Sequence, residues 1–209
     1  MFAAAIADKI SVKLDVRPTN PANRIPLLTS NKVDLLLANI TIAEERAKPR
    51  DTSIPHVASG QQFLARKGTL STPDQFNGLC IGADKGTVNE IVLRRHVPKA
   101  TVVSFDDTPF AFTAQRNGNV RAITQDGPKL VGLRAKVPDR QNYEIPAFSI
   151  SNGYIGVGIP KGEARLRDLL NETLRELEKG GKAAAIYDHW FGPNTEQPLP
   201  RLFRSGEHD

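Results

Sequence analysis

Three polar clusters in the sequence each follow an apolar run with the length of a buried strand. The first begins at the end of VDLLLANI and supplies Asn39, Thr41 and Arg46. A planar guanidinium matches a carboxylate with two parallel hydrogen bonds, and a threonine hydroxyl and free backbone amides supply further donors. Arg46 could instead pair at the surface with Glu44, Glu45 or Asp51, and the pattern alone leaves an anion site and a surface ion pair evenly matched.

The other two clusters lie further along the chain. The segment ADKGTVNE places Thr87 and Val88 at the entry to a predicted helix, where free amides and the helix dipole favour an anion. The segment TQDGP places Asp126 after a strand, where its carboxylate could accept from an ammonium group. Each residue has an ordinary alternative, because Thr87 and Asp126 could simply cap helices. Together the three clusters combine donors for an anion with an acceptor for a cation, which suits a zwitterion such as a free amino acid.

The elements that would position these clusters alternate between strands and helices. Strands are predicted at 12–16, 33–40, 59–68, 79–83, 100–105, 120–125 and 154–162, and helices at 2–10, 20–31, 71–78, 87–97, 108–118, 166–177 and 182–192. The segment between the strand at 120–125 and about residue 150 is predicted to be rich in loops. Strands separated by helices of about ten residues indicate crossover connections and parallel pairing. Open sheets of this kind bind ligands beyond the carboxyl ends of their strands, where all three clusters fall.

Composition excludes several classes of protein. The 209 residues suit one large domain or two small lobes, and no run approaches the roughly 18 to 20 apolar residues of a membrane span. The net charge is +5, but the basic residues are spread along the chain without interleaved aromatic residues, so no nucleic-acid partner is predicted. A single cysteine excludes a disulfide within the chain, and four scattered histidines indicate neither a metal site nor a catalytic pair. No cofactor-binding motif is present, and no cofactor is predicted.

In their order along the chain, these segments resemble the polar-amino-acid branch of the bacterial extracellular solute-binding proteins that feed ABC transporters. NITIAEERAKPRDTS resembles the family segment MTIT-ERAK--DFS, and TPDQFNGLCIGADKGTVNE resembles DL-GK-VGV--GTT-E. IPHVASGQQFLARKG and AAAIYDHWFG are similar to PYY-SG--LLVRK and to the closing Y-KIY-KWFG. The resemblance runs from residue 1 to residue 192.

The resemblance implies an α/β chain with the two-lobe, type II periplasmic-binding-protein fold. Each lobe would be a mainly parallel sheet flanked by helices, and two hinge strands would join the lobes. Lobe 1 would comprise residues 1–62 and 152–209, and lobe 2 residues 63–151. Such a protein performs no chemistry; it would bind a free amino acid and deliver it to a membrane permease, as a monomer in the periplasm. The N-terminal stretch MFAAAIADKISV lacks the features of a signal peptide, so export is implied by the resemblance alone.

The same resemblance assigns roles to the candidate residues. Arg46 would grip the ligand's α-carboxylate, assisted by Thr41 and the main chain near Asn39. From the other lobe, the amides around Thr87 and Val88 would assist as well. Asp126 would take the α-ammonium group. Binding energy would then close the lobes, because only the closed state makes both sets of contacts.

The chain departs from the family pattern in three ways. It begins inside the family's first helix, so the strand before that helix is expected to be missing, which would leave two strand edges unpaired. Pro21 stands where the family often has an aromatic residue that stacks on the ligand. Asn39 replaces a usual glycine and Val88 a usual small or hydroxyl residue, and both changes would narrow the pocket.

Two other functions remain open on the same scaffold. One is an enzyme such as a cyclohexadienyl or arogenate dehydratase, which would need a general acid that titrates near neutrality. The available carboxyl groups are those of Glu44, Glu45 and Glu90. The other is a ligand-sensing module, which would share the site but answer to a signalling partner rather than a permease.

Overall fold

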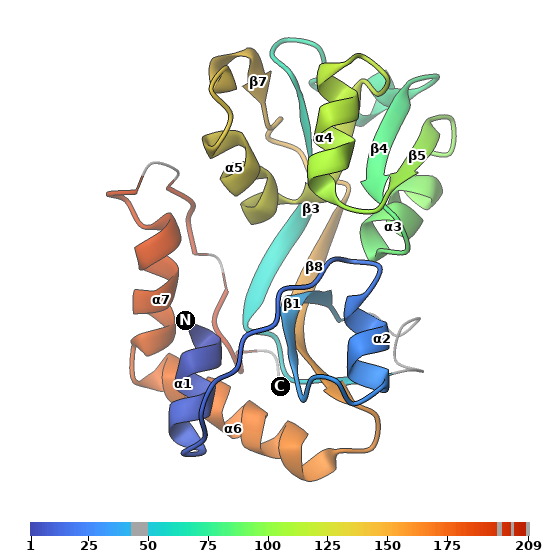
Figure 1. The fold of residues 1–209 in the computed structure, drawn as a ribbon. Coiled ribbons are helices and arrows are strands. Elements are labelled where there is room, and N and C mark those ends of the chain that lie inside the picture. Colours follow the sequence, from blue (N-terminus) through green and yellow to red (C-terminus); the bar gives the residue numbers. More distant parts are fainter. Residues whose placement is uncertain (43–49, 196–197, 202, 208–209) are drawn as a thin grey trace. The chain divides into compact units, whose positions relative to one another are not determined.

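The computed structural model describes residues 1–42, 50–195, 198–201 and 203–207 (Figure 1). The chain divides into two compact units. Unit 1 comprises residues 1–19, 23–58 and 154–209, and unit 2 comprises residues 20–22 and 59–153. The two long strands β3 (Val57–Arg66) and β8 (Ser151–Pro160) each run from one unit into the other.

Unit 1 is built on the carboxyl-terminal half of β8. The strands β1 (Leu36–Thr41) and β2 (Arg50–Thr52) both pair with β8 in antiparallel orientation. Its helices are α1 (Phe2–Lys9), α2 (Arg24–Thr29), α6 (Ala164–Lys179) and α7 (Lys182–Phe191). The apolar faces of α1 and α6 meet β8 in one buried cluster, whose members are Ile6, Val157, Ile159, Leu170 and Leu174.

Unit 2 contains the parallel part of the sheet. The strand β4 (Cys80–Asp84) pairs in parallel with β5 (Thr101–Phe105) and with β6 (Ala122–Asp126), and β6 pairs antiparallel with β3. The connections are α3 (Val88–His96), α4 (Thr108–Arg116) and α5 (Gly127–Ala135), with the short elements η2 (Pro73–Phe76), η3 (Arg140–Asn142) and β7 (Tyr143–Glu144). The carboxyl ends of β4 and β6 therefore lie at the same edge of the sheet.

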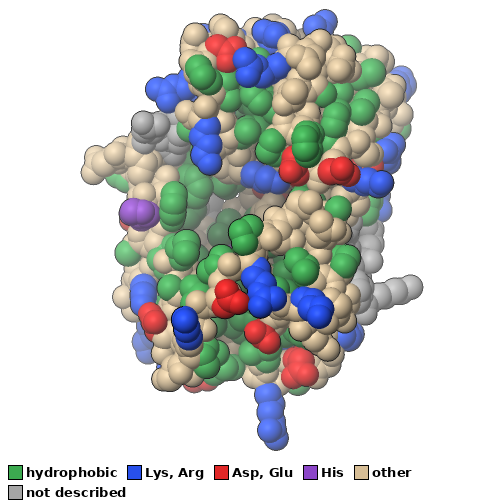
Figure 2. All heavy atoms as spheres, viewed as in Figure 1, with side chains coloured by type: hydrophobic (Ala, Val, Ile, Leu, Met, Phe, Trp, Pro, Cys, Tyr) green, Lys and Arg blue, Asp and Glu red, His purple; other side chains and the backbone are tan. Residues whose placement is uncertain are grey.

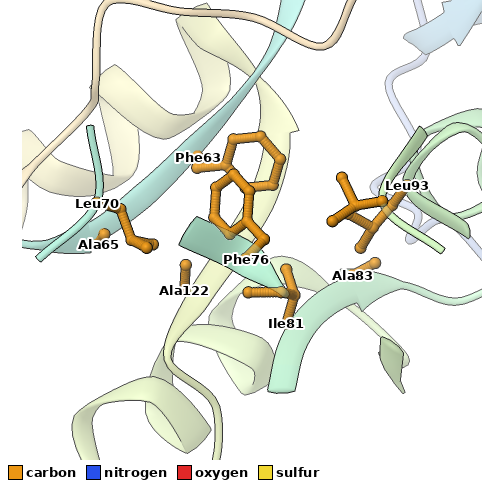
Figure 3. Close-up of a cluster of buried hydrophobic side chains, with 9 residues drawn as sticks. Phe63, Ala65, Leu70, Phe76, Ile81, Ala83, Leu93 and Ala122 are labelled. Atoms are coloured by element: carbon orange, nitrogen blue, oxygen red, sulfur yellow. The ribbon is translucent and has the colours of Figure 1, made fainter. Parts of the chain in front are cut away.

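Both faces of the unit 2 sheet are covered by buried apolar side chains. On one face, Phe63 packs against Phe76 with ring centroids 4.1 Å apart, and Ile81 and Leu93 join the same cluster (Figure 3). Successive residues of a strand point to opposite faces. Accordingly Leu64, the neighbour of Phe63, belongs to the cluster on the other face. A sheet packed on both sides holds the ends of β4 and β6 in fixed positions.

The α/β class predicted from the sequence is confirmed, with a mixed sheet. Parallel pairing occurs in unit 2, whereas the described strand pairs of unit 1 are antiparallel. The prediction of a strand at 12–16 is wrong, because these residues form no strand although their apolar residues alternate. None of the described strands offers this segment a hydrogen-bonded neighbour, and Val12, Leu14 and Val16 are exposed.

The prediction of a loop-rich segment between the strand at 120–125 and residue 150 is wrong for Gly127–Ala135, which form α5 directly after Asp126. It holds for residues 136–150, where the short η3 and β7 are the elements present. A Gly-Pro pair is typical of a turn, but proline is also favoured in the first turn of a helix, where no backbone donor is needed. Burial of Leu130 and Val131 then stabilises the helix.

Three broader features of the described residues bear on function. No helix among them combines the length and low charge needed to cross a membrane. In the same part of the chain, no group of three or more His, Cys, Asp and Glu side chains is arranged to hold a metal ion. On the face shown in Figure 2, lysine and arginine side chains are dispersed among uncharged ones.

Candidate ligand-binding site

Thr87 and Val88 lie where β4 passes into α3. The Thr87 hydroxyl accepts from the backbone amide of Glu90 at 3.2 Å and donates to the carbonyl of Asp84 at 2.7 Å, so it caps the helix. The Thr87 side chain therefore has the helix-capping role that the sequence offered as the alternative to ligand binding. The first turn of a helix leaves amides without intrahelical acceptors. Among the described residues no acceptor is recorded for the amides of Val88 and Asn89, which leaves these two donors for an anion.

Asp126 is the last residue of β6, and its side chain is buried. Asn89 Nδ2 donates to Asp126 Oδ2 at 3.3 Å and to Gln125 Oε1 at 2.5 Å. Although Asp126 occupies the N-cap position of α5, its carboxylate makes no capping hydrogen bond. Because Asn89 belongs to the first turn of α3, its side chain joins the amide end of this helix to the Asp126 carboxylate.

A buried hydrogen-bond network centred on Asp84 supports these groups. The carboxylate of Asp84, which is 1 % exposed, accepts from the Thr108 hydroxyl at 2.8 Å, from Gln125 Nε2 at 2.8 Å and from Lys129 Nζ at 3.0 Å. The lysine neutralises the buried charge, and the other donors satisfy its remaining lone pairs, as a buried carboxylate requires.

Gln125 connects this network to the candidate site. Its Nε2 faces the Asp84 carboxylate, and its Oε1 accepts from Asn89 and from the Asp126 amide at 2.9 Å. If the amide were flipped, its oxygen would face the Asp84 carboxylate and its NH₂ group would face the donors of Asn89 and of the Asp126 backbone. These partners therefore fix the orientation of the Gln125 amide. The orientation of Gln125 in turn fixes that of Asn89.

Unit 1 places Asn39 in an irregular part of β1. The register against β8 shifts between Leu36 and Ile40, and Asn39 has φ 57°. This left-handed conformation favours glycine, and asparagine is among the few other residues that adopt it readily. The Asn39 side chain can thus occupy a position where the resembled family has glycine without changing the backbone.

Two arginines hold the main chain of β1. Arg24 Nη1 donates to the carbonyls of Ala38 and Asn39 at 2.6 and 3.0 Å, and Arg50 Nη2 donates to the carbonyl of Thr41 at 3.1 Å. Thr41 itself ends β1 opposite Ile155 of β8. Arg46 lies outside the described residues, as do Glu44 and Glu45.

Comparison with known proteins identifies the family. The sequence profile of the bacterial extracellular solute-binding proteins, family 3, matches residues 1–193. The chain belongs to this family. The L-cystine-binding protein TcyJ of Escherichia coli strain K12 is 32 % identical over 197 residues, which cover 93 % of this chain and 73 % of TcyJ.

Two solved structures confirm the type II periplasmic-binding-protein fold of this family 3 chain. An ancestral arginine-binding protein bound to glutamine has a TM-score of 0.84 and 30 % identity, covering 91 % of this chain and 85 % of its own. An ancestral amino acid-binding protein that is a precursor of cyclohexadienyl dehydratase has a TM-score of 0.80 and 27 % identity, covering 90 % and 82 %. The matched family is one of binding proteins rather than enzymes.

Glu90, the described carboxyl group considered as a general acid, has the wrong electrostatics for that role. Burial raises its pKa, but hydrogen bonds from Ser104, Arg94 and the Gly86 amide outweigh burial and hold the pKa below its usual value. A general acid needs a pKa raised toward neutrality. In this family 3 protein Glu90 therefore serves to hold the loop before α3.

The sequence did not single out Asn89, Gln125 or Arg24. Asn89 lies in the first turn of the helix predicted at 87–97, and Gln125 ends the strand predicted at 120–125, so both lie beside the candidate residues at the carboxyl edge of the sheet. A search for every polar residue at that edge would have included both of them. Arg24 contacts β1 from α2, and no local pattern marks that contact.

Proposed function

We propose that the chain is the substrate-binding component of an ABC transporter and that it binds a free amino acid. Its family and the amino acids named for its relatives, among them cystine, glutamine and arginine, support this function. The structural observation that carries it is the contact of Asn89 with Asp126 in unit 2. This contact brings free helix amides and a buried carboxylate together, the donors and the acceptor that a zwitterion needs.

The roles of the residues follow from their chemistry. The amides of Val88 and its neighbour, with the dipole of α3, would stabilise the ligand's carboxylate. Asp126 would accept from the α-ammonium group, and a cation is the partner that best offsets the desolvation of a buried carboxylate. Arg46 would hold the ligand's carboxylate from unit 1, together with Thr41 and the main chain near Asn39.

In this proposal the two units act as the lobes. Ligand contacts from both would stabilise a closed state, which the permease would recognise. The proposal includes export to the periplasm, since an extracellular solute-binding protein meets its ligand outside the cytoplasmic membrane. It also includes a monomeric state.

The first experiment is a thermal-shift screen of the twenty amino acids. A ligand that binds only the folded state raises the melting temperature by mass action. The cognate amino acid is then titrated by calorimetry into the wild type, into Asp126→Asn and into Asp106→Asn. Asp106 is an exposed aspartate of unit 2, so its variant carries the same chemical change away from the candidate site.

We expect Asp126→Asn to bind about 10- to 150-fold more weakly, because a hydrogen bond to a charged group contributes about 1.5–3 kcal/mol. Asp106→Asn should bind like the wild type. Arg46→Ala should abolish binding while leaving the melting temperature without ligand near that of the wild type. Equal affinity in Asp126→Asn and Asp106→Asn would show that the ammonium acceptor is wrongly assigned. Turnover of a prephenate-like substrate would instead establish the dehydratase function.

A further inference from the structure

The side chain of Gln61 joins the strand β3 to the first turn of α3. Gln61 lies opposite Asp126 in the antiparallel pair of β3 and β6, and it is 1 % exposed. Its Nε2 donates to the backbone carbonyl of Asn89 at 2.8 Å and to Thr124 Oγ1 at 3.0 Å. Because the Thr124 hydroxyl donates its own proton to the Gln62 carbonyl at 2.9 Å, it can only accept from Gln61. The Thr124 hydroxyl and the Asn89 carbonyl therefore fix the orientation of the Gln61 amide.

The other end of the same amide has no partner. Gln61 Oε1 is buried, and no donor among the described residues reaches it. Two hydrogen bonds at one end and a buried unpaired acceptor at the other have free energies of similar size and opposite sign. The amide therefore contributes little net stability. The Asn89 carbonyl does not depend on it either, because this carbonyl can accept from an amide one turn further along α3.

The contact with Asn89 holds one peptide group of the first turn from two sides. The carbonyl of the peptide between residues 89 and 90 accepts from Gln61, and its N–H donates to Thr87 Oγ1 at 3.2 Å. The amides of Val88 and Asn89, for which no acceptor is recorded among the described residues, come immediately before this peptide. Buried hydrogen bonds in series polarise and strengthen one another. The directions of the two amides therefore depend on Gln61 together with the Thr87 cap.

We propose that Gln61 is a positioning residue of the amino-acid site. It holds the first turn of α3 against β3, so that the amides of Val88 and Asn89 face the ligand's carboxylate and the Asn89 side chain reaches Asp126. This role rests on the proposed function, because Gln61 then serves the same site. Gln61 acts through Asn89 and makes no ligand contact of its own.

Gln115 is a matched control in the same unit. It is 2 % exposed, its Nε2 donates to the carbonyl of Leu64 on β3 at 2.8 Å, and its Oε1 also has no partner among the described residues. Gln115 lies in the last turn of α4, however, and so at the edge of the sheet opposite to the candidate site. Gln61→Met and Gln115→Met each remove one such amide at nearly constant side-chain length, at opposite edges of the sheet.

Hydrogen exchange followed by NMR tests the positioning without a ligand. The amides of Glu90 and Ile91 donate to Thr87 Oγ1 and to the Thr87 carbonyl, so their exchange reports on opening of the first turn. In Gln61→Met this exchange should be about 2- to 12-fold faster, the change expected from loss of one hydrogen bond between uncharged groups. Gln115→Met should leave it unchanged. The core amides of β6 serve as the reference for global stability and should exchange as in the wild type in Gln61→Met.

Calorimetry then tests the effect on binding. The cognate amino acid from the thermal-shift screen is titrated into the wild type and into both variants. Gln61→Met should bind about 3- to 12-fold more weakly, because a misaligned amide loses part of a hydrogen bond to a charged group, and loss of the whole bond would cost at least about 12-fold. Its melting temperature without ligand should stay near that of the wild type. If Gln61→Met does not fold, as judged by circular dichroism, Gln61→Asn takes its place, because its shorter amide does not reach the Asn89 carbonyl.

Faster exchange and weaker binding in Gln61→Met, with neither in Gln115→Met, support the proposal. Unchanged exchange of the two amides would overturn it whether or not an amino acid binds, because Gln61 would not hold the turn. Faster exchange with wild-type affinity would show that the contact serves only the fold. An equal loss of affinity in Gln115→Met would trace the loss to a general change of the core. If no amino acid binds the wild type while Gln61→Met speeds the exchange, the proposed function fails and the hold of Gln61 on the turn stands.

Discussion

Acidification should destabilise unit 1 through His56. Its ring packs edge-on against Phe2 with centroids 5.2 Å apart, and its Nδ1 is buried with no hydrogen-bond partner among the described residues. Desolvation lowers the pKa of His56 from 6.5 to about 4. Between these two values the unfolded chain binds a proton that the folded chain does not. The stability contributed by the neutral ring is therefore present above pH 6.5 and is lost as the pH falls from 6.5 toward 4.

The magnitude follows from the size of the shift. A difference of 2.5 pH units corresponds to at most about 3.4 kcal/mol. The side chain is only half-buried, so water screens part of this energy. We expect about 1–2 kcal/mol between pH 7 and pH 4.

The assay is urea denaturation of the wild type and of His56→Gln at several pH values from 7 to 4. The only tryptophan, Trp190, lies in α7 of unit 1, so its fluorescence follows the unit that contains His56. Carboxylates also titrate in this range, and the difference between the two proteins removes their contribution. His96→Gln, at an exposed histidine, is the matched control. Parallel stability profiles for the wild type and His56→Gln would refute the reasoning.

Two further predictions concern unit 2. Lys129→Met should lower the free energy of unfolding by about 1–3 kcal/mol, below the 3–5 of a fully buried pair, because the Lys129 side chain is 37 % exposed while that of its partner Asp84 is 1 % exposed. Circular dichroism in urea measures this loss, and Lys136→Met, at an exposed lysine of the same segment, should match the wild type. Thr87→Ala should cost about 1 kcal/mol through loss of the α3 cap, and an unchanged midpoint would show that the cap contributes nothing.

The sequence predicted most elements of the fold because local patterns specify them. The leucines of α6 recur at helical spacing and are buried in the structure at Leu170 and Leu174. The segment at 12–16 has an equally clear strand pattern, yet a strand also requires a hydrogen-bonded neighbour, which no local pattern supplies. The alternation of apolar residues thus identified a segment able to form a strand. Residues 12–16 form none, because no described strand pairs with them.

The candidate site was predictable only in part, for a related reason. Thr87 and Asp126 could be chosen because each follows a strand whose end is visible in the sequence. That the two lie close together depends on the parallel register of β4 and β6, in which Ile81 faces Ala122. The role of Asn89 depends on the same register, since its side chain reaches across 37 positions of sequence to Asp126.

The two buried aspartates of unit 2 are linked to each other through the side chains of Gln125 and Asn89. Asp84 is neutralised by the cation of Lys129 and accepts from two neutral side chains as well, so its charge is committed within the unit. Asn89 donates from a neutral amide to Asp126, and this hydrogen bond orients the Asp126 carboxylate. Gln125 connects the Asp84 network to Asn89, and Asn89 in turn orients the Asp126 carboxylate. In the proposed function, this network therefore positions Asp126 for the ammonium group of the ligand.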